Sequence, residues 1–241
     1  MNLETMNRNN EVTLEQTLDV KFKTASRRSL IIMPLYVLVP VLFAVAFHLA
    51  GYELEWKAFG LGALGWMIAL VLRAPVGLLI QRMPQPKAKK IMIASSGVME
   101  ESVRLILLAL TSVASSWALS IGQGWAAIEV IYTMVSVIAI ASLANRTDEK
   151  AMEAKAFLEA QGSIQTSPLW GILERIWASA FHIGCTLIVA SNPWTVVLLI
   201  PLHSGVNALV VKLAAKSIPK SSLAIAVFGL GSLAIGITLM L

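Results

Sequence analysis

Apolar runs of about 20 residues recur along this chain, and they constrain its fold more than any other feature. Short polar breaks separate the runs, which cover roughly 29–51, 57–82, 91–116, 120–144, 168–190, 194–213 and 220–241. A helix needs about 20 apolar residues to cross the hydrocarbon layer of a membrane. The alternating strands of a closed barrel are absent from the pattern. The runs therefore predict an all-α, polytopic membrane helix bundle of about seven transmembrane helices.

The composition agrees with a membrane protein and argues against other classes. Hydrophobic residues make up 57% of the 241 residues and charged residues only 14%, and the mean hydropathy is +0.75. A water-soluble domain does not need this much apolar surface to fill its core. The net charge of +5 is spread over the breaks between runs, so we expect no nucleic acid partner. We expect a multi-pass protein of the cell membrane, surrounded by lipid.

The basic residues indicate how the bundle is oriented. They gather before the first run and after the second, fourth and sixth, at Arg27, Arg28, Lys87, Lys89, Lys90, Arg146, Lys150, Lys155, Lys212, Lys216 and Lys220. The alternate breaks carry only Lys57. Because basic residues are enriched in cytoplasmic loops, the amino terminus is predicted to be cytoplasmic and the carboxyl terminus outside.

Two polar segments accompany the seven-helix domain that is predicted for residues 29–241. Residues 1–28 form a polar cytoplasmic segment in which Leu14, Leu18 and Phe22 recur every four residues. This interval predicts a short amphipathic helix on the membrane surface, with a frayed tail as the alternative. Residues 145–167 form a cytoplasmic loop, and the stretch MEAKAFLEAQ within it predicts a short helix.

Ionisable side chains inside the apolar runs are the strongest functional signal. A charge at the bilayer centre costs about 3 kcal/mol even on insertion scales, so such groups usually face the protein interior and serve a function. The second to sixth runs contain Arg73, Glu100, Glu101, Arg104, Glu129, Glu174, Arg175, His182, His203 and the amide of Asn207. The chain has only three histidines, and two of them belong to this set.

The helical rise of 1.5 Å per residue gives each group a depth below the predicted cytoplasmic surface. Arg73, Glu100 and His203 all lie at roughly 13 to 14 Å, whereas His182 lies at roughly 21 Å and Glu174 at roughly 9 Å. We therefore expect Arg73 to neutralise Glu100, helped by a kink at the nearby Pro75.

Two acidic positions in the apolar runs each fit more than one role. Glu129 is placed nearer the outer surface, where a role in the site and a role in packing are both open. Glu174 and Arg175 are shallower than the other groups and fit either a gate or a pair that locks two helices.

Spacing along the helices adds a second constraint, since residues four apart share a helix face. Glu100 projects with Arg104, and His203 projects with Asn207. Together with His182 they supply what hydrolysis requires: a base that activates water, and donors or a metal that hold an oxyanion. The alternatives are a structural ion pair and histidines that only hydrogen-bond across an interface.

Three segments of the chain resemble the motifs of a known family. They are MEESVRL at 99–105, LERIWASAFH at 173–182 and HSGVN at 203–207. They are similar to the motifs of the YhfC family of intramembrane peptidases, part of the CAAX-protease and bacteriocin-processing (CPBP) superfamily. Its members carry a Glu-Glu-x-x-(x)-Arg helix, a second helix ending in His and a third with His-x-x-x-Asn. The order of the three motifs extends the resemblance over most of the chain.

The resemblance implies a role for each matching residue. Glu100 is the water-activating base, with Glu101 beside it and Arg104 holding the carboxylates. The site is completed by groups that stabilise the oxyanion or coordinate a metal: His182, His203 and Asn207. A divalent metal such as zinc would take its ligands from Glu100, His182 and His203. The chain has no HExxH signature, so a metal site and a metal-free glutamate mechanism are both open.

One departure from the family pattern bears on activity. Relatives carry a Gly-His-Gly segment before the glutamate of the fourth helix, whereas this chain reads GQGWAAIE, with Gln123 where the histidine would stand. The leading hypothesis is an intramembrane peptidase that cleaves a peptide bond in a membrane-associated or lipidated substrate. The alternatives are a noncatalytic scaffold or partner-binding subunit of the same fold, and a small proton-coupled transporter.

Overall fold

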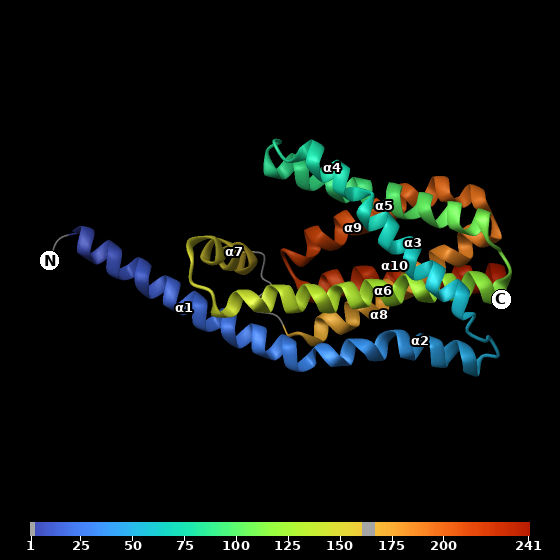
Figure 1. Cartoon of the computed structure of the whole chain (residues 1–241), viewed down its shortest axis with the longest axis horizontal. Coiled ribbons are helices and arrows are strands. Elements are labelled where there is room, and N and C mark those ends of the chain that lie inside the picture. The colour runs from blue at the N-terminus through green and yellow to red at the C-terminus, as the bar shows by residue number, and fades with distance from the viewer. Residues whose placement is uncertain (1–2, 161–166) are drawn as a thin grey trace.

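The protein is all helical over the residues that the computed structural model describes, which are 3–160 and 167–241 (Figure 1). Side chains are described from residue 16 to 159 and from residue 167 onward. The α-helices are α1 (Leu3–Ile32), α2 (Leu38–Leu49), α3 (Trp56–Val71), α4 (Arg73–Ile80), α5 (Gln85–Leu110), α6 (Ser115–Ser142), α7 (Glu149–Ala160), α8 (Leu169–Ser191), α9 (Val196–Ala214) and α10 (Ile218–Met240). Short 3-10 turns are η1 (Met33–Val37), η2 (Leu143–Asn145) and η3 (Pro193–Thr195). The predicted all-α class is confirmed.

Six segments of the described chain are long and apolar enough to cross a membrane. They are Gln16–Leu49, Trp56–Ile80, Ser115–Asn145, Leu169–Ser191, Pro193–Ala214 and Ile218–Met240. Helix α5 is not among them, because Glu100, Glu101 and Arg104 fall in its apolar half. The protein is therefore a multi-pass membrane helix bundle, and the count of seven spans, with α5 as the seventh, stays a prediction.

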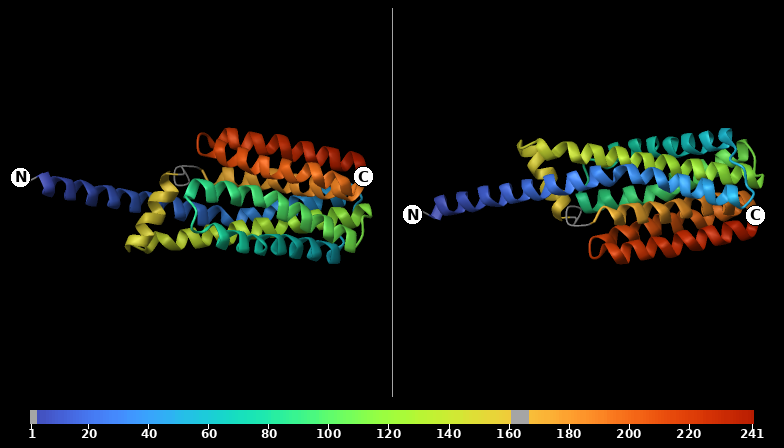
Figure 2. Two further views of the ribbon diagram at one scale, coloured as in Figure 1. Left: turned by 90° about the horizontal axis from the view of Figure 1, so that it is seen from above. Right: turned by 90° about the horizontal axis from the view of Figure 1, so that it is seen from below.

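The connections between helices gather at two opposite ends of the bundle (Figures 1 and 2). One end holds the α4–α5 and α9–α10 connections together with α7, and the basic clusters of the sequence lie there; we call it the basic end. At the other end the Tyr52 hydroxyl donates to the Leu241 carbonyl at 3.3 Å, and the Ser115 hydroxyl donates to the Met240 carbonyl at 2.6 Å. The assignment of the basic end to the cytoplasm stays a prediction.

The polar amino-terminal segment is continuous with the first apolar run, because α1 extends without a break from Leu3 to Ile32. Figure 2 shows α1 extending beyond the bundle and α7 lying across the basic end. Phe22 is buried, with the Lys155 amine of α7 at 5.5 Å from its ring. The apolar stripe predicted for the membrane surface thus contacts α7 at Phe22, while the side chain of Leu14 lies outside the described residues.

Helix α8 is the centre of the bundle. All of its residues from Ala178 to Ala190 are buried, whereas the other candidate spans bury about a fifth of theirs. Glycines allow its neighbours to approach closely: a Cβ on Gly184 would lie 2.3 Å from the Ser232 carbonyl carbon of α10, and one on Gly122 of α6 would lie 2.9 Å from the Ile183 Cα. This contact with several helices places His182 at the core of the molecule.

Candidate functional site

The first member of the site is Glu100 on α5, which forms an ion pair with Arg73. The helix breaks after Val71, so that Arg73 begins α4 and Pro75 falls in the first turn, where proline is tolerated. The kink predicted at Pro75 is thus a break three residues earlier, and the predicted Arg73–Glu100 pair is confirmed. Glu100 is buried, and its Oε2 has no hydrogen-bond partner among the described residues.

Arg104 is fully buried and organises the neighbouring part of the site. It forms an ion pair with Glu101 of its own helix, and its guanidinium lies 4.6 Å from the Trp125 ring centroid. Its Nη2 lies 3.1 Å from His182 Nδ1 and donates to it. The sequence paired Arg104 with Glu100 by their spacing of four residues. The structure corrects this pairing, since Glu100 is paired with Arg73 and Arg104 instead bonds Glu101, three residues away.

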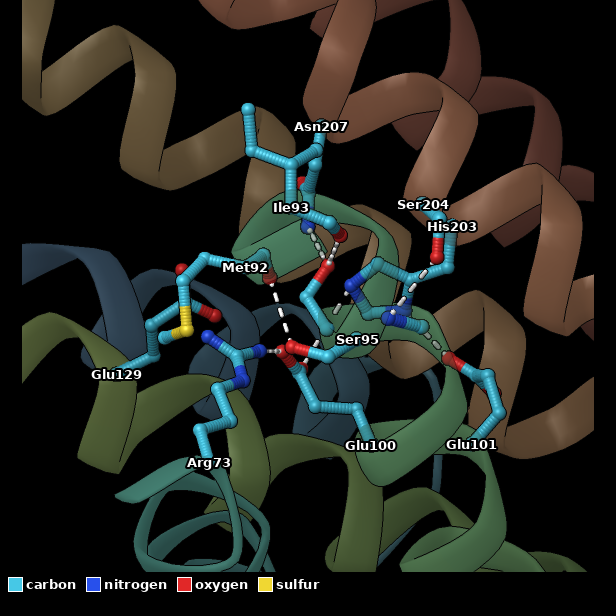
Figure 3. A network of polar contacts seen from close by, with 12 residues as sticks. Arg73, Met92, Ile93, Ser95, Glu100, Glu101, Glu129, His203, Ser204 and Asn207 are labelled. Atoms are coloured by element: carbon cyan, nitrogen blue, oxygen red, sulfur yellow. Dashed lines mark hydrogen bonds and ion pairs between the residues drawn. The ribbon is translucent and has the colours of Figure 1, made fainter. Parts of the chain in front are cut away.

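His203 on α9 meets both carboxylates of α5 (Figure 3). Its Nδ1 lies 2.6 Å from Glu101 Oε1, and its Nε2 lies 3.6 Å from Glu100 Oε2. The ionised Glu101 can only accept, so the Nδ1–H donates, and in the neutral imidazole Nε2 then carries the lone pair. The close approach of the two helices brings these groups together: Gly97 N–H donates to Ser204 Oγ at 3.2 Å, and that hydroxyl donates to the Ala94 carbonyl at 2.8 Å.

His182 on α8 lies between Arg104 of α5 and Glu129 of α6. Its Nδ1 accepts from Arg104 and lies 3.9 Å from Glu100 Oε2, while its Nε2 lies 2.5 Å from Glu129 Oε2 on α6. The depth estimate put His182 well below Glu100, yet the side chains meet, because helix tilt and side-chain length cover the difference.

Glu129 belongs to the site, which sequence reasoning had left undecided. Besides His182 it contacts Arg175, whose Nη1 donates to Glu129 Oε1 at 2.5 Å. Arg175 also donates to Glu174 at 3.0 Å, so Glu174 joins the network at its margin. The depth estimate gave the level of Glu129 along its helix but not the direction in which its side chain points. A helical wheel of α6 that showed Glu129 on the face toward α8 would have supplied that direction.

A cavity of about 300 Å³ joins these groups. Its lining comes from six helices and consists of Trp66, Leu70, Arg73, Glu100, Glu129, Tyr132, Thr133, Ser136, Arg175, His182, His203 and Asn207. The Asn207 amide donates to the Ser96 hydroxyl at 2.8 Å, which fixes it at the wall of the cavity (Figure 3). Glu101 and Arg104 lie behind the wall and are fully buried.

The donor set fits a divalent metal. One ligand atom each from Glu100, His182 and His203 can be chosen so that all lie within 4.8 Å of one another. Tetrahedral zinc separates its ligand atoms by about 3.4 Å, which is close to the 3.6 and 3.9 Å between Glu100 Oε2 and the two imidazoles. The Glu101–His203 bond is the usual carboxylate support of a metal-binding imidazole. His182 Nδ1 can bind a metal only after the hydrogen bond that it accepts from Arg104 is broken.

Gln123 lies outside this arrangement. It is a buried residue of α6, its Oε1 has no hydrogen-bond partner among the described residues, and it is not part of the cavity wall. Glu129 follows it by six positions, which corresponds to about 9 Å along the helix and a different face. Gln123 therefore takes no part in the cavity wall.

A family model matches residues 35–228, well over half of the chain, and its description is YhfC intramembrane metalloprotease. The chain belongs to the YhfC family. No curated protein and no solved structure matches it. The membership makes this YhfC protein an intramembrane protease by class, a hydrolase with a protein or peptide substrate in a lipid environment. The family description also indicates a divalent metal, for which Glu100, His182 and His203 form a suitable group.

Proposed function

We propose that this YhfC protein hydrolyses a peptide bond of a membrane-associated or lipidated substrate in the cavity beside Glu100, His182 and His203. One observation carries the proposal. Three helices bring these three side chains within 4.8 Å of one another at a cavity, although burying them in a membrane protein is costly. A merely structural ion pair needs neither a cavity nor a carboxylate oxygen without a hydrogen bond. The wider relation to the CPBP superfamily is part of this proposal.

The proposed metal ligands are Glu100, His182 and His203, with zinc as the ion that suits one carboxylate and two imidazoles. A bound ion would lower the pKa of water and polarise the scissile carbonyl. Two neighbouring side chains hold the ligands in place: Arg73 binds Glu100, and Glu101 accepts from His203. Arg104 then acts as a positioning residue, because it fixes both Glu101 and the His182 ring.

The sequence assigned Glu100 as the base that activates water. If Glu100 binds the metal, another residue has to take this role. The Oε1 of Glu100 is taken by Arg73, and a single free oxygen, Oε2, cannot both bind an ion and accept a proton. Glu129 is the other carboxylate in the cavity wall and is therefore proposed to take the proton of the attacking water, once its Oε2 is released from His182 Nε2. The water oxygen bonds to the carbonyl carbon, the C–N bond breaks, and the proton passes to the leaving amine. In a metal-free mechanism Glu100 Oε2 would take that proton instead.

Asn207 is proposed to donate to the carbonyl oxygen as negative charge develops on it. Its amide group is held at the cavity wall by Ser96, so the donor is fixed before substrate binds. Fixed donors stabilise a developing charge better than mobile ones, because they do not have to reorganise during the reaction.

Labelling of new protein amino termini tests the proposal in cells. Membranes from cells expressing the wild-type protein should contain termini that are missing from cells expressing the Glu100→Gln variant at equal abundance. A noncatalytic scaffold predicts the same termini in both. A proton-coupled carrier predicts the same termini too, and in addition solute flux in proteoliposomes made from the purified protein.

A further inference from the structure

A second cavity lies at the basic end of the bundle, and the proposed hydrolysis does not use it. It holds about 350 Å³, which falls within the range of roughly 300 to 1,000 Å³ that is typical of small-ligand sites. Its wall is assembled from α1, η1, α5, α6, α8, α9 and α10. We call it the basic-end cavity, and its polar wall residues are Ser29, Tyr36, Lys89, Ser167 and Glu174.

Tyr36 brings to this cavity a hydroxyl that the described residues leave without a partner. Only 6% of Tyr36 is exposed, and its ring packs in a small apolar cluster with Val39 and Val130. The hydroxyl reaches the first turn of α8, where a Cβ on Gly171 would lie 2.0 Å from it. It forms no hydrogen bond with the described residues, although Tyr36 and Gly171 both line the cavity. A buried tyrosine hydroxyl normally has a hydrogen-bond partner, so we expect a group in the cavity to supply one.

Two opposite charges lie in the same wall. Lys89, near the start of α5, forms no ion pair with the described residues. Glu174 of α8 accepts from Arg175 through Oε1 at 3.0 Å, and 40% of its side chain is exposed. Because Arg175 is shared with Glu129, it neutralises Glu174 only in part. A ligand that satisfies both sides of the wall therefore carries an anionic group and a cationic group.

The surroundings of the cavity suit the headgroup of a lipid. Tryptophan and tyrosine are enriched where a membrane meets water, and Trp170 and Tyr36 both line the cavity. Val211 of α9 lines it as well and is 37% exposed. Val197 lies about four turns away on nearly the same face of α9, toward the other end of the bundle, and is 62% exposed. A headgroup in the cavity can thus leave its acyl chains on this exposed apolar face.

We propose that the basic-end cavity binds the headgroup of a phospholipid that carries a phosphate and a primary ammonium group, as phosphatidylethanolamine does. The Lys89 amine and the Tyr36 hydroxyl donate to the phosphate, and Glu174 accepts from the ammonium group. Hydrogen bonds between charged groups are the strong ones in proteins, and basic pockets between membrane helices typically bind phosphorylated headgroups. The assignment does not depend on the proposed peptidase activity, because no residue of the metal-ligand set takes part in it.

The two charges of the wall argue against other ligands of similar size. A purely anionic headgroup satisfies Lys89 but brings negative charge toward Glu174. A choline headgroup has no N–H with which to donate to that carboxylate. Free phosphoethanolamine has the required charges but lacks the acyl chains that the exposed face of α9 would hold. These three ligands are therefore the comparisons that the test requires.

Native mass spectrometry of the full-length protein tests the assignment. The delipidated protein is mixed in detergent with phosphatidylethanolamine, phosphatidylglycerol and phosphatidylcholine of identical acyl chains at equal concentration. Phosphatidylethanolamine should bind with about tenfold preference over the other two, because only its headgroup makes charge-assisted hydrogen bonds to both sides of the wall. Glu100→Gln should bind it as the wild-type protein does, so the result stands whether or not the peptidase proposal fails.

Substitutions in the wall assign this preference to the cavity. Lys89→Gln should lower the affinity for phosphatidylethanolamine about tenfold, whereas Lys90→Gln, the exposed neighbour outside the cavity, should stay within about twofold of wild type. Tyr36→Phe removes only the hydroxyl and should lower the affinity about fivefold. Glu174→Gln should weaken phosphatidylethanolamine about tenfold but leave phosphatidylglycerol unchanged, a difference that a merely structural role of Glu174 would not produce.

Each competing explanation predicts a different result. Equal binding of the three lipids, or equal effects of Lys89→Gln and Lys90→Gln, would indicate an ordinary lipid shell and overturn the proposal. A preference for phosphatidylglycerol that ignores Glu174→Gln would replace the zwitterionic ligand by an anionic one. Displacement of the lipid by an equal concentration of free phosphoethanolamine would assign the cavity to a soluble ligand and overturn the lipid assignment.

Discussion

Two buried charged clusters in the described part of the chain differ in how well their polar atoms are satisfied. At the basic end the Lys155 amine donates to Asp19 and to the Arg146 carbonyl, and it lies over the Phe22 ring. In the membrane cluster several buried atoms have no hydrogen-bond partner among the described residues, namely Arg73 Nε, Glu100 Oε2, Glu101 Oε2 and Arg104 Nε.

The comparison teaches which cluster holds the fold together and which one is available for chemistry. A buried charge with all its bonds made fixes neighbouring helices and has no capacity left for a ligand. Lys155 joins α7 to α1 in this way. The membrane cluster keeps an acceptor that the protein itself does not use, Glu100 Oε2, on a residue of the cavity wall. Such a surplus is costly unless water, a metal or a substrate makes the remaining bonds.

The largest effect is expected from Glu100→Gln, which removes the charge but keeps the shape of the side chain. Cleavage should fall by at least about 100-fold, because the variant loses either the ligand or the base of the reaction. The yield of new amino termini measures this at equal protein abundance. Glu153→Gln on α7 alters an exposed carboxylate and should have no effect. Activity of Glu100→Gln above a tenth of wild type would mean that the membrane cluster is structural, like the one at Lys155.

A smaller loss is expected from Glu101→Gln, which tests the support of His203. The amide can still accept from Nδ1–H but lacks the charge that makes the imidazole a better ligand. Zinc affinity of the purified protein should fall about ten- to hundredfold. Equilibrium dialysis with zinc measures it, with Glu153→Gln as the control and circular dichroism as the check on folding. Unchanged zinc affinity would show that the hydrogen bond between Glu101 and His203 does not contribute to metal binding.

The cluster at the basic end should respond through stability rather than through zinc binding or cleavage. Lys155→Met removes a fully buried amine, which leaves the Arg146 carbonyl without this donor and Asp19 with Lys23 alone. We expect a loss of about 2 kcal/mol in the free energy of unfolding. Faster hydrogen exchange in α7 and a lower thermal midpoint measure it. Zinc affinity should stay within about twofold of wild type, because the two clusters are far apart and share no partner.

The sequence predicted which residues form the membrane cluster better than it predicted which of them form ion pairs with one another. Glu100 and His203 were matched by depth, and their side chains do meet. Pairing Arg104 with Glu100 was wrong, because spacing within one helix does not reveal that Arg73 of another helix takes that carboxylate. Predicting such a competition needs the rotation of each helix about its axis, which depth estimates lack.

Two other parts of the chain, Phe22 in α1 and helix α5, show the same limit in other forms. Phe22 fits an amphipathic stripe for a membrane surface, but the sequence does not tell whether lipid or another helix covers it, and α7 contacts it. The charges that mark α5 as functional also lower its hydropathy, so the helix that carries Glu100 is the one left out of the six candidate spans. A functional helix in a membrane is thus the hardest to count by composition.

The smallest effect is expected from Lys21→Gln, the exposed counterpart of Lys155→Met. Lys21 also joins α1 to α7, through Glu159 at 3.2 Å, but 51% of its side chain is exposed. Water solvates both charges once the pair is broken, so unfolding should change by no more than about 0.5 kcal/mol. The two variants therefore break ion pairs between the same two helices and differ mainly in burial. If thermal unfolding in one buffer gave equal losses for both, the hydrogen bonds around Lys155 would not explain how α7 is held.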